Sequence, residues 1–261
     1  MEFNLCIQGK KEEIKIFPRL MEMNVGIELQ SYGLEGVSSK NKWYSRMKTH
    51  RRILKEFNGR VIIHGPFLGI RYTYNDYLLR EAVFKRMQMT YKLVKELNPD
   101  IVVLHSGFSE EMRSFNLEDL WLNETANFWK KEIYKYEKVN TRIVIENVIE
   151  DKPSLLMKLC DIVDSKFFGL CLDVGHTNIF SNLPIKEWIS KMGKRLHYVH
   201  LHDNSGKEDE HLPVGKGNIN FDDIFNKLKE VIPDVQVSLE VDDNIENNIE
   251  NLEMVIKKYN F

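Results

Sequence analysis

Residue types that bind metals or move protons follow short apolar runs at several points in this sequence. Runs at residues 61–63, 101–104, 143–145 and 169–172 are each followed at once by a histidine or a carboxylate, and two later runs end with one. The six residues concerned are His64, His105, Glu146, Asp173, His200 and Glu240. Burying carboxylates without a cation is costly, and only scattered lysines and arginines occur near these runs, so a bound divalent metal is expected.

Three further residues of metal-binding type occur just beyond these runs. They are His176, three residues after Asp173, and the pair Asp209 and His211. Mixed histidines and carboxylates suit zinc, manganese, cobalt or iron better than calcium. Nine candidate ligands exceed the need of one ion, so we expect one to three divalent metals per chain (zinc, manganese, cobalt or magnesium), unless some of the nine bind substrate.

The remaining histidines and one glycine-rich segment receive other interpretations. His202 shares the alternation of His200 but has no partner in the pattern, so a structural or supporting role is expected. His197 and His50 are also expected to be structural. The segment 213–217 contains Lys216 and Gly217, which either bind a phosphate through backbone amides and the lysine, or simply form a turn.

The elements that carry these residues recur along the whole chain. Strands are expected at residues 3–7, 25–30, 60–67, 101–107, 142–147, 169–176, 197–204 and 235–242. Longer segments with helical periodicity lie between them, such as residues 76–97. Strands that alternate with helices form a parallel sheet, and eight consecutive units indicate a closed (β/α)8 TIM barrel, with an open doubly wound sheet as the alternative. No linker divides the chain, so residues 1–261 are expected to form a single domain.

A barrel of this kind would bring the candidate ligands together. The carboxyl ends of all eight strands meet at one mouth, where active sites of such barrels lie. Side chains alternate along a strand, so if Glu240 and Asp173 point inward, the small residues Ser238 and Cys171 also point inward.

Composition excludes several classes of protein. The 261 residues are 43% hydrophobic and 29% charged with a net charge of -2, which is typical of a globular protein without a general affinity for nucleic acid. The three cysteines have no paired spacing, and neither a signal peptide nor an 18-residue apolar run is present, so a cytoplasmic protein without membrane attachment is expected. Motifs of serine hydrolases, dinucleotide-binding folds and Walker loops are absent.

Several of these segments resemble the xylose isomerase-like barrels, a group that unites sugar isomerases and epimerases with the endonuclease IV family (AP endonuclease family 2). The resemblance extends over essentially the whole chain. Its most specific parts are Ile145-Glu146-Asn147, the segment 171–176 (Cys-Leu-Asp-Val-Gly-His), the segment 200–204 (His-Leu-His-Asp-Asn), the segment 209–217 (Asp-Glu-His-Leu-Pro-Val-Gly-Lys-Gly) and Leu239-Glu240.

The resemblance implies a role for each ligand position. Glu146, Asp173, His200 and Glu240 match the metal site that both branches share. In the epimerases the two glutamates also accept and donate the proton while the metal stabilises an enediolate, and His176 would touch a substrate oxygen. In the nucleases a zinc cluster is completed by residues that match His64, His105, His176, Asp209 and His211.

Departures from the nuclease pattern favour the first branch. The nucleases have Gly-Gln-Gly soon after the glutamate of the fifth strand, where this chain reads Val148-Ile149-Glu150. They also have Asp-Thr-Cys-His at the sixth strand, where this chain has Asp-Val-Gly-His at 173–176. Phe67 stands where the nucleases have tyrosine. Hydride-shift chemistry is disfavoured, because the sixth strand offers no lysine near the metal.

Three hypotheses remain. The favoured one is a metal-dependent isomerase or epimerase of a small sugar or sugar phosphate, with Glu146, Glu240 and His176 as catalytic residues. The alternative is a multinuclear zinc phosphodiesterase of the endonuclease IV type, with DNA as its partner. A barrel with a purely structural metal is the third, but a structural zinc needs only four ligands. The sequence leaves the substrate and the oligomeric state undetermined.

Overall fold

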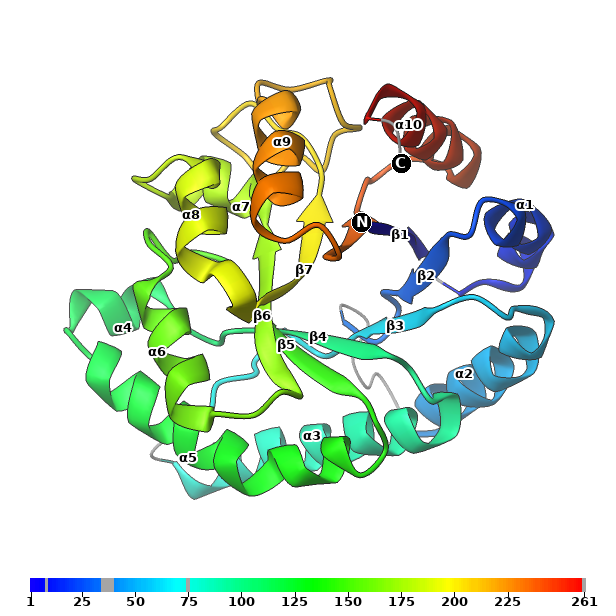
Figure 1. Cartoon of the computed structure of the whole chain (residues 1–261). Helices are drawn as coiled ribbons and strands as arrows, with labels where there is room; N and C mark the ends of the chain where they lie inside the picture. Colours follow the sequence, from blue (N-terminus) through cyan, green and yellow to red (C-terminus); the bar gives the residue numbers. More distant parts are fainter. Residues whose placement is uncertain (8, 34–39, 74–75, 260–261) are drawn as a thin grey trace.

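Eight parallel strands close into a barrel in the computed structural model of the chain, which describes residues 1–7, 9–33, 40–73 and 76–259 (Figure 1). The strands are β1 (Glu2–Ile7), β2 (Gly26–Leu29), β3 (Val61–His64), β4 (Ile101–His105), β5 (Arg142–Glu146), β6 (Phe168–Asp173), β7 (Leu196–Leu201) and β8 (Gln236–Leu239). Each strand pairs with the next, and β8 pairs with β1 to complete the ring. The predicted (β/α)8 TIM barrel is confirmed.

Helices surround this barrel on the outside (Figure 1). They are α1 (Phe17–Glu22), α2 (Lys40–Ile53), α3 (Tyr77–Leu97), α4 (Glu110–Ser114), α5 (Glu118–Glu137), α6 (Ser154–Val163), α7 (Val174–Phe180), α8 (Ile185–Met192), α9 (Phe221–Val231) and α10 (Ile245–Tyr259), with short 3-10 helices at Lys11–Ile16, Leu54–Glu56 and Gly193–Arg195. Among these described helices none is long and apolar enough to span a membrane.

Helix α3 shows how the sequence sets an element of this ring. The Asp76 carboxylate accepts hydrogen bonds from the backbone N–H groups of Leu78 and Leu79 and so caps the first turn. Apolar residues such as Val83 and Met87 recur on one face and pack into the core between helices and sheet. Asn98 adopts a left-handed conformation with φ of 48° and ends the helix.

The interior of the barrel is a separate small core. It consists of Ile62, Ile101, Val103, Val144, Cys171 and Tyr198. Cys171 therefore points inward, and Ser238 does too, because its Oγ lies 3.1 Å from Sγ of Cys6 on the neighbouring strand. Both orientations were expected from the alternation of side chains, and both are confirmed.

Each predicted strand run overlaps one strand, but four runs (60–67, 169–176, 197–204 and 235–242) were predicted three residues too long at their carboxyl ends. The run 169–176 shows one physical reason. Residues 169–176 were expected to be extended, whereas β6 ends at Asp173 and α7 begins at Val174. The reason is local: the Asp173 carboxylate accepts a hydrogen bond of 2.7 Å from the backbone N–H of His176 and caps the new helix. His176 therefore lies on the first turn of α7.

Candidate metal centre

Four residues from four strand ends meet at the mouth of the barrel. Glu146 and Asp173 end β5 and β6, His200 is the penultimate residue of β7, and Glu240 follows β8 directly. One ligand atom from each lies within 4.8 Å of the others. We call these four residues the inner group.

The ring of His200 is at the centre of the inner group. Its Nδ1 lies 3.0 Å from Oε2 of Glu240, 3.2 Å from Oε1 of Glu146 and 3.7 Å from Oδ2 of Asp173. Glu146, Asp173 and His200 are at most 1% exposed, so water screens these charges little.

The charges of the inner group fit a divalent cation. Within the described part of the chain, no lysine or arginine pairs with its three carboxylates. Burial by itself raises the pKa of Glu146, but His200 and His105 beside it hold that pKa well below its usual value. Burial lowers the pKa of His200, and the surrounding Cys171, Glu240, Glu28 and Glu146 raise it well above its usual value. The group thus gathers positive charge on an imidazole, and a metal held by Glu146, Asp173, His200 and Glu240 would supply that charge instead.

Two histidines extend the inner group along β3 and β4. Nε2 of His64 lies 3.2 Å from Oε2 of Glu146, and Nε2 of His105 lies 3.5 Å from the same atom. Burial lowers the pKa of His105 to about 4, so it is neutral at pH 7. Burial also lowers the pKa of His64, but the Glu146 carboxylate outweighs it and raises that pKa to about 9. Phe67 stacks on His105 with ring centres 4.5 Å apart.

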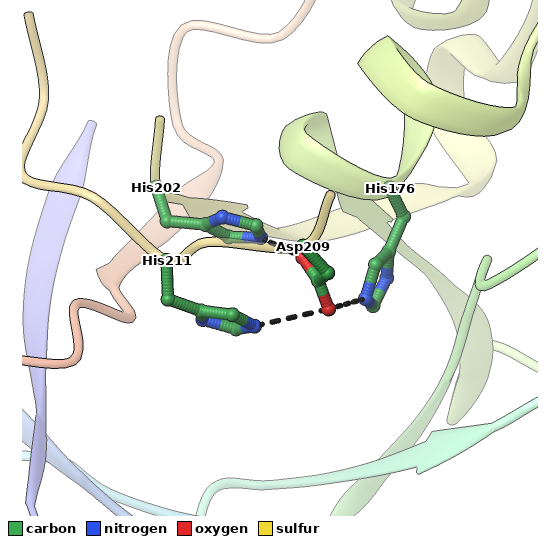
Figure 2. A group of neighbouring side chains, drawn as sticks. All are labelled: His176, His202, Asp209 and His211. Carbon is green, nitrogen blue, oxygen red and sulfur yellow. Dashed lines mark hydrogen bonds and ion pairs between the residues drawn. The ribbon is translucent and has the colours of Figure 1, made fainter. Parts of the chain in front are cut away.

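A second cluster lies further out at the same mouth, and we call it the outer group (Figure 2). It consists of His176, His202, Asp209 and His211, and one ligand atom of each lies within 4.8 Å of the others. Oδ2 of Asp209 lies 3.2 Å from Nε2 of His176 and 3.3 Å from Nε2 of His211. His176 is on α7, and the other three residues are in the segment that follows β7.

The nine sequence-predicted ligand positions are thus brought together at one mouth, but their roles as ligands or catalysts stay predictions. His202 was expected to be structural or supporting, and its position allows either that role or metal binding. Its Nε2 lies 3.0 Å from Oδ1 of Asp173 in the inner group, and its ring stacks on His211 with centres 3.9 Å apart. His202 therefore links the two groups. Gly175 makes room for it, because a Cβ there would lie 2.0 Å from the imidazole.

His50 and His197, which were expected to be structural, are in none of the candidate ligand clusters of the described residues. His50 is buried on α2, where its Nδ1 lies 2.8 Å from the hydroxyl of Tyr32. His197 is near the amino end of β7 and packs against Gly169, where a Cβ would lie 2.1 Å from its ring.

Asp203 holds the loop that carries Asp209 and His211. Its buried carboxylate accepts hydrogen bonds from the backbone N–H groups of Asn204, Gly215 and Ile219 at 2.9–3.1 Å. An antiparallel bridge between Asp203 and Leu212 closes the loop further. The amide of Gly215, within the segment considered for phosphate binding, is therefore already paired with a carboxylate.

Lys216 of the same segment lines a different hollow. This hollow has a volume of about 660 Å³ and lies between the loop and α10, where Asp222, Asn247 and Lys258 also line it. The phosphate-binding role of Lys216 and Gly217 stays an untested prediction.

A cavity of about 790 Å³ opens over the inner and outer groups. Its described lining includes the candidate ligands Glu146, Glu240, His64, His105, His176, Asp209 and His211. The lining also includes Glu13, Asp242 and Asp243, and Lys10 is the only lysine or arginine in the described lining. The volume suits a small molecule, which typically occupies roughly 300–1,000 Å³.

Two residues that contact the inner group were not identified from the sequence, namely Glu28 on β2 and Gln30 just after β2. Glu28 is fully buried inside the barrel and lies 3.1 Å from Nε2 of His200. Gln30 donates a hydrogen bond to Oε1 of Glu240. The signal was a glutamate in the middle of a run of buried strand residues, Val25 to Leu29, where an apolar side chain would be expected.

Comparison with known families gives one match across most of the chain. The model of the family described as xylose isomerase-like TIM barrel matches residues 27–258. Among curated relatives, the uncharacterized protein MJ1311 of Methanocaldococcus jannaschii is 28% identical over 240 residues, which cover 89% of this chain and 79% of that protein. A protein named probable endonuclease 4 of Aquifex aeolicus is 22% identical over 197 residues, 68% of each chain.

Solved structures share the whole fold. A D-tagatose 3-epimerase-like protein is 26% identical, with a TM-score of 0.80 over 99% of this chain and 97% of that chain. The TTHB071 protein from Thermus thermophilus, whose crystal was soaked with ZnCl2, is 22% identical, with a TM-score of 0.72 over 99% of both chains.

Proposed function

The chain belongs to the xylose isomerase-like TIM barrel family, and from this premise we propose that it is a divalent-metal-dependent isomerase or epimerase of a small polyhydroxylated carbonyl compound. The observation that supports this most is the inner group, in which the buried Glu146 and the partly buried Glu240 contact the same imidazole nitrogen in a cavity of small-molecule size. The D-tagatose 3-epimerase-like protein, with 26% identity over almost the whole chain, supports the same reaction class.

The two glutamates are placed to move a proton. Each has one oxygen beside His200, while the second oxygen of Glu146 contacts His64 and that of Glu240 accepts a hydrogen bond from Gln30. Their carboxylates are ionised, because histidines beside them, His200 above all, outweigh burial and lower both pKa values. One glutamate accepts the proton from the carbon beside the substrate carbonyl. The other first takes up a proton, from a neighbouring imidazolium such as His64 beside Glu146 or from water in the cavity, and then returns it to the resulting enediolate.

A metal in the inner group would polarise the substrate carbonyl and stabilise the negative charge that develops on its oxygen. His176 would reach a substrate oxygen from the wall of the cavity through Nε2, which would exchange Asp209 for that oxygen. Its Nδ1 lies 3.0 Å from the carbonyl oxygen of Asn147, and its Nε2 faces Asp209, which fixes the ring at the cavity edge.

The lining of the cavity favours an uncharged substrate. Glu13, Asp209, Asp242 and Asp243 line the cavity, and Lys10 is the only described cation of lysine or arginine type in that lining. A phosphate or a nucleic-acid backbone is normally bound by several such cations. The carboxylates of the lining would repel the negative charge of a phosphate. A neutral ketose or a related keto compound avoids this repulsion, and its hydroxyl groups can donate hydrogen bonds to the carboxylates.

Solvent-deuterium exchange tests this function. The purified, metal-loaded protein is incubated with a panel of ketoses in deuterium oxide, and deuterium at the carbon beside the carbonyl is measured by NMR. We expect exchange and epimerised product with at least one ketose, and a loss of at least about 100-fold in Glu240→Gln, because that variant lacks one proton-transfer group. Normal exchange in folded, metal-loaded Glu240→Gln would contradict the mechanism.

A multinuclear phosphodiesterase remains the alternative, and the outer group is the observation that favours it. Inner and outer groups together with His64 offer ligands for more than one metal, and a relative named probable endonuclease 4 matches 68% of the chain. Two or three zinc ions per chain, together with cleavage of abasic-site DNA, would favour this alternative. One metal per chain and no DNA cleavage would reject it.

A further inference from the structure

Glu28 is a buried carboxylate that the proposed proton transfer does not use. It lies on β2 inside the barrel with no exposed surface. The hydroxyl of Tyr198 donates a hydrogen bond of 2.8 Å to its Oε2, and its Oε1 lies 3.1 Å from Nε2 of His200. A carboxylate is costly to bury in a barrel interior, so a specific function for Glu28 is expected.

Glu28 lies at one edge of the His200 ring, and the inner group lies at the other. Nε2 faces Glu28, while Nδ1 faces Glu146 and Glu240 at 3.0–3.2 Å. A neutral imidazole carries its proton on one nitrogen and a lone pair on the other. Both nitrogens face carboxylates, but only Nδ1 faces the cluster of candidate ligands Glu146, Asp173 and Glu240. A metal bound there through Nδ1 leaves the proton on Nε2, where the Glu28 carboxylate is placed to accept its hydrogen bond.

We propose that Glu28 is a positioning residue that makes His200 present the lone pair of Nδ1 to a metal in the inner group. Tyr198 in turn holds the Glu28 carboxylate in place through the hydroxyl that it donates. A carboxylate behind a metal-binding histidine fixes the ring orientation and increases its basicity. This inference rests on the metal centre of the proposed function, but not on the reaction catalysed there.

Glu28 is not itself placed to bind that metal. The candidate ligand clusters among the described residues include His200 with Glu146, Asp173, Glu240 or His64, but not Glu28. Its contact with His200 is through Nε2, on the side away from the nitrogen that faces the inner group.

Metal affinity in two variants tests the proposal. Glu28→Gln keeps the volume of the side chain but offers an amide N–H to Nε2, which favours a proton on Nδ1 and blocks that lone pair. We expect it to bind Zn²⁺ and Co²⁺ about 10–100-fold more weakly than wild type in competition with a chelator, and to change the visible spectrum of bound Co²⁺. The matched control Tyr198→Phe removes one hydrogen bond but keeps the carboxylate, so its loss is expected to be about fivefold or less.

A measurement on the unaltered protein covers the case in which Glu28→Gln does not fold. Long-range ¹H–¹⁵N NMR of the Zn²⁺-loaded wild type is expected to show His200 with Nδ1 bound to metal and Nε2 protonated. Coordination through Nε2, or unchanged affinity and Co²⁺ spectrum in folded Glu28→Gln, would overturn the proposal. If the wild type binds no divalent metal, both this proposal and the metal centre are rejected. If the metal results are as expected but no ketose is turned over, only the proposed reaction is rejected.

Discussion

The buried side chains at the mouth of the barrel are mostly carboxylates and histidines, whereas most buried side chains of a protein are apolar. Glu146 and Asp173 are almost fully buried, and the positive groups around them are histidines. Histidine has a pKa near neutrality and binds metals through either nitrogen. The same residues can therefore balance the carboxylates without metal, as imidazolium, or with metal, as neutral ligands.

His50 gives a pH prediction that is independent of the metal centre. Burial lowers its pKa to about 4 from 6.5, with Tyr32 bonded to the ring. The unfolded chain therefore binds a proton below pH 6.5 that the folded chain does not. The stability that neutral His50 provides is fully present above pH 6.5 and is lost as the pH falls toward 4, by about 3 kcal/mol in total.

Urea unfolding between pH 7 and pH 4.5, with a chelator present throughout, measures this effect. We expect the free energy of unfolding of wild type to fall more steeply with decreasing pH than that of His50→Gln, by up to about 1.4 kcal/mol per pH unit. Parallel curves for the two proteins would show that folding does not lower the pKa of His50.

At the scale of elements, the metal centre depends on how strands end. β6 passes into α7 without a loop because Asp173 caps the helix with the same carboxylate that faces His200. The loop after β7 is long, and Asp203 shapes it through three backbone N–H groups. Gly217 allows this close approach, since a Cβ there would lie 2.3 Å from Oδ1 of Asp203.

Asp203→Asn is expected to loosen this loop. An amide group replaces one acceptor oxygen with a donor that faces backbone N–H groups, so at least one of three charge-assisted hydrogen bonds is lost. We expect the free energy of unfolding to fall by about 1.5–3 kcal/mol and amide hydrogens of residues 204–219 to exchange faster. Hydrogen-exchange mass spectrometry measures the second effect.

Asp209→Asn is the matched control in the same loop. It removes a carboxylate of the outer group but leaves the three hydrogen bonds to Asp203 in place. In metal-free protein its exchange rates in residues 204–219 are expected to stay near those of wild type. Equal protection of that loop in Asp203→Asn and wild type would contradict the role given to Asp203.

At the scale of the whole molecule, the candidate metal ligands are brought together only by folding of the barrel. They come from β3 to β8 and from the loop after β7, so the site is complete only when the ring of strands is closed. A metal that binds this site but not the unfolded chain stabilises the whole fold.

Metal removal is therefore expected to lower the unfolding temperature. At a free Zn²⁺ or Mn²⁺ concentration 100 times the dissociation constant, the gain should be about 2.7 kcal/mol relative to protein in chelator. Differential scanning calorimetry with and without metal tests this. His200→Gln serves as the control, because it lacks the central imidazole and should gain much less; an equal gain in this variant would place the stabilising metal elsewhere.

The local pattern of the sequence was sufficient for the barrel and for most of its mouth. Apolar runs that end in His64, His105, Glu146 or Asp173 were read correctly as strand ends, because strand formation and the switch to a polar residue are properties of a few neighbouring residues. The end of β6 was predicted three residues too late. Asp173 caps α7 at this point, so the chain becomes helical where the apolar pattern predicted a longer strand.

Only the tertiary structure decided which side chains face one another. Glu28 and His200 are 172 residues apart, and no local pattern relates them, yet the closure of the barrel places them 3.1 Å apart. His202 likewise acquired its place between the inner and outer groups from the packing of β7 against α7. The sequence by itself determined the order of elements and the residue types at their ends, because these are short-range properties. The orientation of His200, the link made by His202 and the separation of Lys216 from the cavity depend on contacts between distant segments, and only the closed barrel creates them.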